Sequence, residues 1–139
     1  MEYTFPRQYL YRRVVRAKLF IDHNFASRID LDNIADEACF SKFHFTRLFR
    51  QIYGKTPHQY LTAVRIKHAR ELLAGEATVA AVCFAVGFDS ITSFTGLFRR
   101  RVGMTPAAFR AAAHERKQDS LERPLKFVPN CFVDRAPRA

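Results

Sequence analysis

The 139-residue sequence lacks the features that mark several classes of protein. It contains no tryptophan, and its longest apolar run, residues 79–86, is far too short to cross a bilayer core of about 30 Å. The N-terminal residues do not place a charged segment before an apolar one, as a secretory signal does. We therefore expect no membrane contact and a cytoplasmic location.

The sequence also gives little support for a metal site, a disulfide framework or a catalytic site. Cys39, Cys83 and Cys131 form no CxxC pair, and an odd number of cysteines fits poorly with a disulfide framework. Cys39 and Cys83 lie in apolar stretches typical of small buried side chains, with a redox switch as the less favoured alternative. The histidines show no metal-ligand spacing, and we find no nucleophile–base set, paired carboxylates or phosphate-cradling glycine loop. We expect no metal, no cofactor and no enzymatic activity.

Acidic residues are missing from two long windows of the sequence. The net charge is +10, and no acidic residue lies between Glu37 and Glu71 or between Asp89 and Glu115. Basic side chains fill both windows: Lys42, Arg47, Arg50, Lys55, Arg65, Lys67 and Arg70 in the first, and Arg99, Arg100, Arg101 and Arg110 in the second. A generic solvated basic surface is one interpretation, but the clustering favours an anionic polymer as partner.

The apolar pattern is that of an all-α protein. Apolar residues recur at spacings of three and four, and a capping residue, a glycine or a proline stands at each boundary. These signals predict seven helices, over residues 7–24, 31–38, 42–53, 57–74, 79–86, 90–102 and 106–115. In the long fourth helix the inward face is expected to include Tyr60, Leu61, Val64, Ala69, Leu72 and Leu73. Prolines interrupt residues 116–139, which are predicted to form an extended arm and tail, with Leu125–Val133 packing on the body.

Two segments of the chain repeat one pattern. From Phe45 to Pro57 the matching residues recur 49 positions later, ending at Pro106, whereas Phe40 matches Phe88 at an offset of 48. Each copy is a short helix, a tight turn and a longer helix, which is the helix-turn-helix arrangement. We therefore predict two helix-turn-helix subdomains within residues 7–115: a first unit over 7–56, a central linker helix over 57–74, and a second unit over 78–115.

The buried aromatic face of each longer helix leaves an outer face for DNA. In the third helix this face carries Phe43, Thr46 and Arg47 in the N-terminal turns, where a helix in the major groove meets base edges. Arg47 can bond bidentately to guanine, and Phe43 can pack against thymine methyl groups. The sixth helix presents smaller side chains, so we expect methyl and phosphate contacts there with weaker base discrimination. The expected phosphate contacts are Lys42, Arg50, Lys55, Thr56, Ser90, Thr95, Arg99, Arg100 and Thr105.

The length of the fourth helix sets the distance between the two units. About eighteen residues at 1.5 Å each span roughly 27 Å, enough to hold two recognition helices about one DNA turn apart. A single chain is therefore expected to read two adjacent major-groove segments of double-stranded DNA as a monomer. The two segments should lie about ten base pairs apart and lack two-fold symmetry.

One spaced motif runs through both units and the linker helix. It comprises Ser41, Phe45, Leu48, Phe49, Gly54, Thr56, Pro57, Tyr60, Leu61 and Arg65, followed by Val86, Gly87, Phe88, Phe94, Leu97, Phe98, Gly103, Thr105, Pro106, Phe109 and Arg110. The motif resembles the DNA-binding domain of the AraC/XylS transcription regulators. The resemblance covers about residues 7–115 and implies a bacterial seven-helix domain that activates promoters by contacting DNA and RNA polymerase. It places base-reading residues at Phe43, Thr46 and Arg47 and, in the second unit, at Ile91, Thr92, Ser93 and Gly96.

The sequence shows no large effector-binding domain on either side of the motif. It therefore resembles the small standalone activators of the family, which act as monomers. Two other functions stay open at this point. The chain could be an accessory protein that docks a partner through Leu125–Val133, with DNA binding secondary, and a DNA-bound regulator could also repress.

Overall fold

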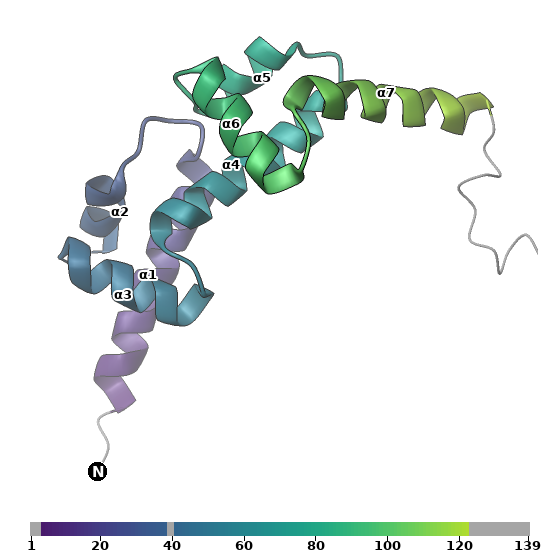
Figure 1. Cartoon of the computed structure of the whole chain (residues 1–139). Helices are drawn as coiled ribbons and strands as arrows, with labels where there is room; N and C mark the ends of the chain where they lie inside the picture. The colour runs from purple at the N-terminus through teal and green to yellow at the C-terminus, as the bar shows by residue number, and fades with distance from the viewer. Residues whose placement is uncertain (1–3, 39–40, 123–139) are drawn as a thin grey trace, which may run out of the picture.

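The computed structural model describes residues 4–38 and 41–122, which form seven helices and no strand, so the all-α prediction is confirmed. The helices are α1 (Thr4–Asn24), α2 (Leu31–Ala38), α3 (Lys42–Tyr53), α4 (Pro57–Leu73), α5 (Val79–Ala85), α6 (Ile91–Val102) and α7 (Pro106–Glu122). In Figure 1, α4 runs through the centre of the molecule, with α1 to α3 around its first half and α5 to α7 around its second half.

Capping residues explain most of the helix boundaries. Five hydroxyl side chains accept the N–H group of the residue three positions later: those of Ser41, Thr56, Thr78 and Ser90, which have extended backbone, and that of Thr105. Gly54 and Gly103 end α3 and α6 in the left-handed conformation, at φ 75° and 91°. Glycine adopts this conformation without the steric cost that a Cβ atom imposes.

Two hydrophobic cores hold the fold together, and α4 contributes to both. The first core joins α1, α2 and α3 to Leu61 in the first half of α4. The second core joins α5 and α6 to Ile66, Ala69 and Leu73 in the second half of α4. Phe25, directly after α1, packs against both cores. Each half of the molecule thus has its own apolar interior, and the shared helix fixes their separation.

Two details of the first four helices differ from the prediction. α1 begins at Thr4 and not at residue 7, so Pro6 lies in its first turn, where the missing N–H group costs no helical hydrogen bond. Leu72 was expected on the inner face of α4 but is 42% exposed, whereas Ile66 is buried. Ile66, Ala69 and Leu73 share one helical face, and Leu72 lies off that face.

The largest difference concerns α7, which continues to Glu122 and does not end near Glu115. Residues 116–122, assigned above to the extended arm, are helical. Most of their side chains are exposed, and arginine, lysine, glutamine and glutamate favour helix without needing an apolar face. The rest of the predicted arm, including Leu125–Val133, lies outside the described residues, as do Cys39 and Cys131.

The described residues offer little reactive chemistry. Cys83 is buried in the second core, in agreement with its apolar surroundings in the sequence. Burial raises the pKa of its thiol, which keeps the sulfur protonated and unreactive. Within residues 4–38 and 41–122, no three histidine, cysteine, aspartate or glutamate side chains gather as a metal site would require. None of the helices in these ranges combines the length and apolar character needed to cross a bilayer.

Candidate nucleic-acid interface

The outward face of α3 carries the three residues predicted to read bases in the first unit. Phe45 and Phe49 are fully buried, so they turn one face of α3 to the core and leave Phe43 and Arg47 exposed on another. Phe43 is 81% exposed although it is fully apolar. Thr46 is half-buried, and its hydroxyl donates to the carbonyl oxygen of Lys42 at 2.8 Å. The Thr46 side chain therefore offers a partner its methyl group and an acceptor oxygen.

α3 and α6 have the same length and align without a gap. The offset is 49 from the N-caps, Ser41 and Ser90, to the C-caps, Gly54 and Gly103. At this offset Thr95 stands in the place of Thr46. The sequence repeat already paired these two residues, although Thr46 was predicted to read bases and Thr95 to contact phosphate.

The second unit has no long polar side chain where the first unit has Arg47. The equivalent residue is Gly96, and a Cβ atom added there would meet nothing within 4 Å. Packing within the protein therefore does not require glycine at this position. Ile91, Thr92 and Ser93 are exposed in the first turn of α6. This surface offers hydroxyl groups and one branched apolar side chain, which make weaker base contacts than a guanidinium does.

The helix starts after Thr56 and Thr105 differ in the N–H groups that they offer to a phosphate. In the first unit the Thr56 N–H donates to Oε1 of Gln59 at 3.0 Å, and the Gln59 N–H donates to the Thr56 hydroxyl at 3.2 Å. This capping box occupies two donors. In the second unit the Ala108 N–H donates to the Thr105 hydroxyl at 3.2 Å, but alanine has no side chain to return a bond. The start of α7 is therefore the better phosphate candidate of the two.

The basic side chains predicted to contact phosphate are all exposed. Two of them, Lys42 and Arg100, have a partner within the protein. Nζ of Lys42 lies 3.2 Å from a carboxylate oxygen of Asp32, a pair that sequence reasoning missed. Both side chains are exposed, so the pair contributes no more than about 1 kcal/mol and a phosphate can compete for the lysine. Nε of Arg100 donates to the carbonyl oxygen of Gly96 at 3.3 Å. Arg50, Lys55 and Arg99 are exposed near the ends of their recognition helices or just beyond them.

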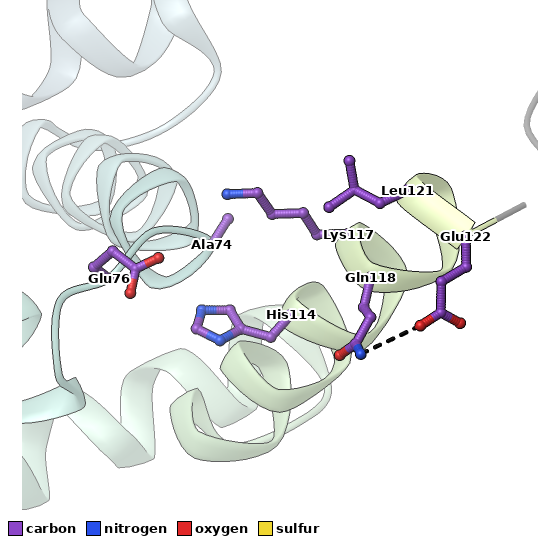
Figure 2. A pocket seen from close by; sticks show the side chains of 7 residues that line it. All are labelled: Ala74, Glu76, His114, Lys117, Gln118, Leu121 and Glu122. Carbon is purple, nitrogen blue, oxygen red and sulfur yellow. Dashed lines mark hydrogen bonds between the residues drawn. The ribbon is translucent and has the colours of Figure 1, made fainter. Parts of the chain in front are cut away.

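A solvent-open hollow is lined by residues of α7 and of the segment directly after α4, and by none of α3 or α6. Figure 2 shows His114 and Lys117 of α7 extending toward Glu76 and Ala74, which follow α4, while Gln118 bonds to Glu122. Nε2 of His114 lies 2.7 Å from the carbonyl oxygen of Gly75. This contact ties the middle of α7 to the end of α4, so the hollow belongs to the scaffold that supports the second unit.

Arg65 is a further residue whose role the sequence did not reveal. It is half-buried in α4, between Val64, which packs on the first core, and Ile66 in the second core. Its guanidinium donates to the carbonyl oxygens of Phe25 and Ser27 at 2.7 and 2.9 Å. Burial lowers the pKa of Arg65, and the nearby carboxylate of Asp89 opposes that shift. A cation between two apolar stretches of a predicted helix was the only sign of this contact in the sequence.

Comparisons with known proteins agree with this architecture. A family model described as a helix-turn-helix domain matches residues 34–112. The chain is 36% identical over 85 residues to the MmsAB operon regulatory protein of Pseudomonas aeruginosa, a match that covers 60% of this chain but only 28% of that protein. It is 32% identical over 93 residues to the transcriptional activator AarP of Providencia stuartii, covering 66% of this chain and 69% of AarP. The crystal structure of the DNA-binding domain of AdpA, solved with a target DNA, superposes with a TM-score of 0.70 at 30% identity, covering 80% of this chain and 96% of that domain.

Proposed function

The chain belongs to the AraC/XylS family of helix-turn-helix regulators, and we propose on that premise that it binds double-stranded DNA in a sequence-specific way and regulates transcription, most directly as an activator. One chain reads two adjacent major-groove segments as a monomer in the cytoplasm. The observation that carries the proposal is the residue-for-residue repeat of α3 in α6, with each copy anchored in its own core and joined by one helix.

The first unit supplies most of the base recognition. Arg47 offers the bidentate donor pair that suits guanine, and Phe43 offers an exposed ring for thymine methyl groups. Thr46 adds a methyl group and an acceptor oxygen. The second unit reads bases more weakly through Ile91, Thr92, Ser93 and the backbone at Gly96, and it binds phosphate through Arg99, Arg100 and the start of α7.

The length of α4 suits two successive grooves. Its 17 residues span about 26 Å at 1.5 Å per residue. The recognition helices pack on its two halves, which suits half-sites about one helical turn apart, or about 34 Å along the duplex axis. No second chain is required to fill the second groove.

Activation would add a contact with RNA polymerase to the DNA contacts. The activator AarP is a relative of this chain over two thirds of its own length. The matched region makes up 69% of that activator, and we therefore include a contact with RNA polymerase in the proposal. Transcription in vitro from a promoter carrying the bound site, with and without the chain, tests this part alone.

Selection from a random duplex library with the purified chain tests the DNA-binding proposal. The expected result is one enriched sequence bound at least about a thousandfold more tightly than a scrambled duplex. The logarithm of the affinity should fall linearly with the logarithm of salt concentration, because phosphate contacts release counterions. Enrichment of no sequence, together with salt-independent affinity, would reject the proposal in favour of an accessory protein.

Two arginine variants separate base reading from phosphate binding. Arg47→Ala is expected to cost about 1–3 kcal/mol of binding free energy and to relax the preference at one base pair. Arg50→Ala, one turn later on the same helix, serves as the matched control: it should weaken binding to all sequences alike and reduce the salt slope by about one. If Arg47→Ala keeps full affinity and the same preference, α3 does not read bases as placed here.

A further inference from the structure

The loop after α1 and the turn before α6 meet beside the middle of α4, where the two helix-turn-helix units come together. A separate contact lies near the start of α4, where the Arg101 guanidinium of α6 donates to the carbonyl oxygen of Gln59 at 3.4 Å. The loop between α1 and α2 belongs to the first unit, and the turn between α5 and α6 belongs to the second. Phe25 in the loop packs against both cores. Its ring also stacks on His68 of α4, with ring centroids 4.1 Å apart. The loop is therefore held on the linker helix next to the second unit.

Arg65 connects this loop to the second unit. Its guanidinium donates to the carbonyl oxygens of Phe25 and Ser27 at 2.7 and 2.9 Å, and it lies 5.7 Å from the centre of the Phe88 ring. Phe88 is part of the second core. A planar, half-buried guanidinium that donates two bonds and lies near a ring fixes direction as well as distance, which a lysine cannot do.

Gly87 brings the turn of the second unit close to the same loop. Its φ is 98°, and an added Cβ atom would lie 2.7 Å from the carbonyl oxygen of Phe25 and 3.0 Å from Nε of Arg65. The glycine is thus required for its backbone conformation and for close approach. Next to it, Asp89 pairs with Arg28 of the loop, with oxygen and nitrogen 3.3 Å apart. Both of these side chains are exposed, so the pair adds little stability but joins the same two segments.

From these contacts we infer that Arg65 and Gly87 are positioning residues that fix the orientation of the second helix-turn-helix unit relative to the first and thereby, together with the length of α4, set the spacing between the two DNA segments. The inference rests on the proposed function. Each unit has its own core, so loosening the junction leaves both units folded. What changes is their relative orientation, and with it the benefit of binding both segments at once.

Arg65→Lys and Gly87→Ala test the inference on duplexes that differ only in spacing. The panel consists of the selected duplex and versions with one base pair inserted or removed between its two segments. The wild-type chain should lose about tenfold or more in affinity for each altered spacing. Both variants should bind the original duplex about tenfold more weakly, and the altered spacings should cost them less than about threefold.

Two control variants make the same types of substitution outside the junction. They show whether a changed spacing penalty comes from the junction or from the substitution type itself. Arg70→Lys changes another arginine of α4 that lies 5.6 Å from an aromatic ring centre, that of Phe109, outside the junction. Gly75→Ala changes a glycine whose added Cβ would make only one ordinary contact, at 3.4 Å. Both controls should keep the wild-type spacing penalty. If Arg65→Lys and Gly87→Ala also keep that penalty while folded, the inference is wrong.

A measurement without DNA keeps the inference testable if a variant fails to fold or if no duplex is selected. Residual dipolar couplings of the wild-type chain should fit one common alignment for α1 to α3 and α5 to α7. Couplings of Arg65→Lys should require two alignments, with secondary structure unchanged. Two alignments in the wild-type chain, or one in a folded Arg65→Lys variant, would overturn the inference. Failure of the proposed function would appear separately, as loss of duplex binding by a wild-type chain that fits one alignment.

Discussion

Phe49 and Tyr60 pack edge to face with ring centroids 5.6 Å apart, and the second unit repeats this contact between Phe98 and Phe109 at 5.5 Å. In each unit the pair joins the recognition helix to the helix that follows it. Each residue of the second pair lies 49 positions after its counterpart in the first pair, so the repeat seen in the sequence is also a repeat of packing. The units therefore share a scaffold and differ in the side chains they present outward.

The buried aromatic pairs should determine stability, and the exposed Phe43 should not. Phe49→Ala and Phe98→Ala each remove a ring that is fully buried, so each should lower the free energy of unfolding by about 3–5 kcal/mol. Phe43→Ala serves as the control, with an expected change within about 0.5 kcal/mol and a weakened sequence preference. Urea unfolding followed by circular dichroism measures all three. A cost below 1 kcal/mol for both buried rings would mean that these pairs do not anchor the recognition helices.

Gly96 is the place where the second unit can be changed to resemble the first. Gly96→Ala should raise stability by up to about 1 kcal/mol, since glycine is unfavourable inside a helix and an added Cβ would meet no atom within 4 Å. Gly96→Arg should restore the donor pair present at Arg47 and add about 1–3 kcal/mol of preference for one base pair in the second segment. Thermal unfolding and repeated duplex selection check both. Loss of affinity in Gly96→Ala, with stability raised, would show instead that DNA approaches the backbone at this residue.

The pair between Lys42 and Asp32 should compete with a phosphate group for the lysine. Lys42→Ala should lower affinity for all duplexes alike and reduce the salt slope by about one. Asp32→Asn removes the competing carboxylate and should raise affinity for all duplexes, while the free energy of unfolding changes by less than about 1 kcal/mol. Titrations at several salt concentrations distinguish these effects. If Asp32→Asn leaves affinity unchanged, Lys42 does not contact phosphate.

The hydrogen bond from Tyr60 to Asp22, 2.6 Å long, should make stability depend on pH. Partial burial by itself raises the pKa of Asp22, but the bond from Tyr60 and the pairing with Lys18 outweigh it and lower the pKa overall. A lowered carboxyl pKa stabilises the fold above the unfolded pKa of about 3.9 and loses that contribution as the pH falls through the folded value. Burial and the bond to Asp22 raise the pKa of Tyr60 to about 12, so its contribution is complete below about pH 10 and is lost as the pH rises toward 12.

Tyr60→Phe tests this pH dependence. The substitution should cost about 1–2 kcal/mol between pH 5 and pH 9, and the cost should shrink toward both acid and alkaline pH. Urea unfolding of the two chains from pH 3 through neutral to alkaline pH gives the difference directly. A cost that is the same at pH 3 and pH 7 would show that the hydrogen bond to the Asp22 carboxylate does not contribute.

Sequence reasoning found the elements that local chemistry determines. Ser41, Ser90, Gly54 and Gly103 bound the two recognition helices, and their caps depend only on neighbouring residues. The end of α7 was missed because its last turns bury no apolar face, so no periodic signal marks them.

Contacts between distant segments were the other features missed. Arg65 reaches Phe25 across 40 positions in the chain, and Asp89 reaches Arg28 across 61. No local pattern encodes such a distance. The pairing of Lys42 with Asp32 was missed for the same reason, because the two residues lie on different helices.

A base-by-base substitution scan of the selected duplex tests the central claim most directly, which is that one chain reads two adjacent major-groove segments unequally. The expected result is two blocks of sensitive base pairs centred about ten base pairs apart, with one chain bound per duplex. Substitutions in the block read by α3 should cost about 1–3 kcal/mol each, and those in the block read by α6 less than about 1 kcal/mol. A single block, or two equal blocks related by two-fold symmetry with two chains bound, would contradict the account.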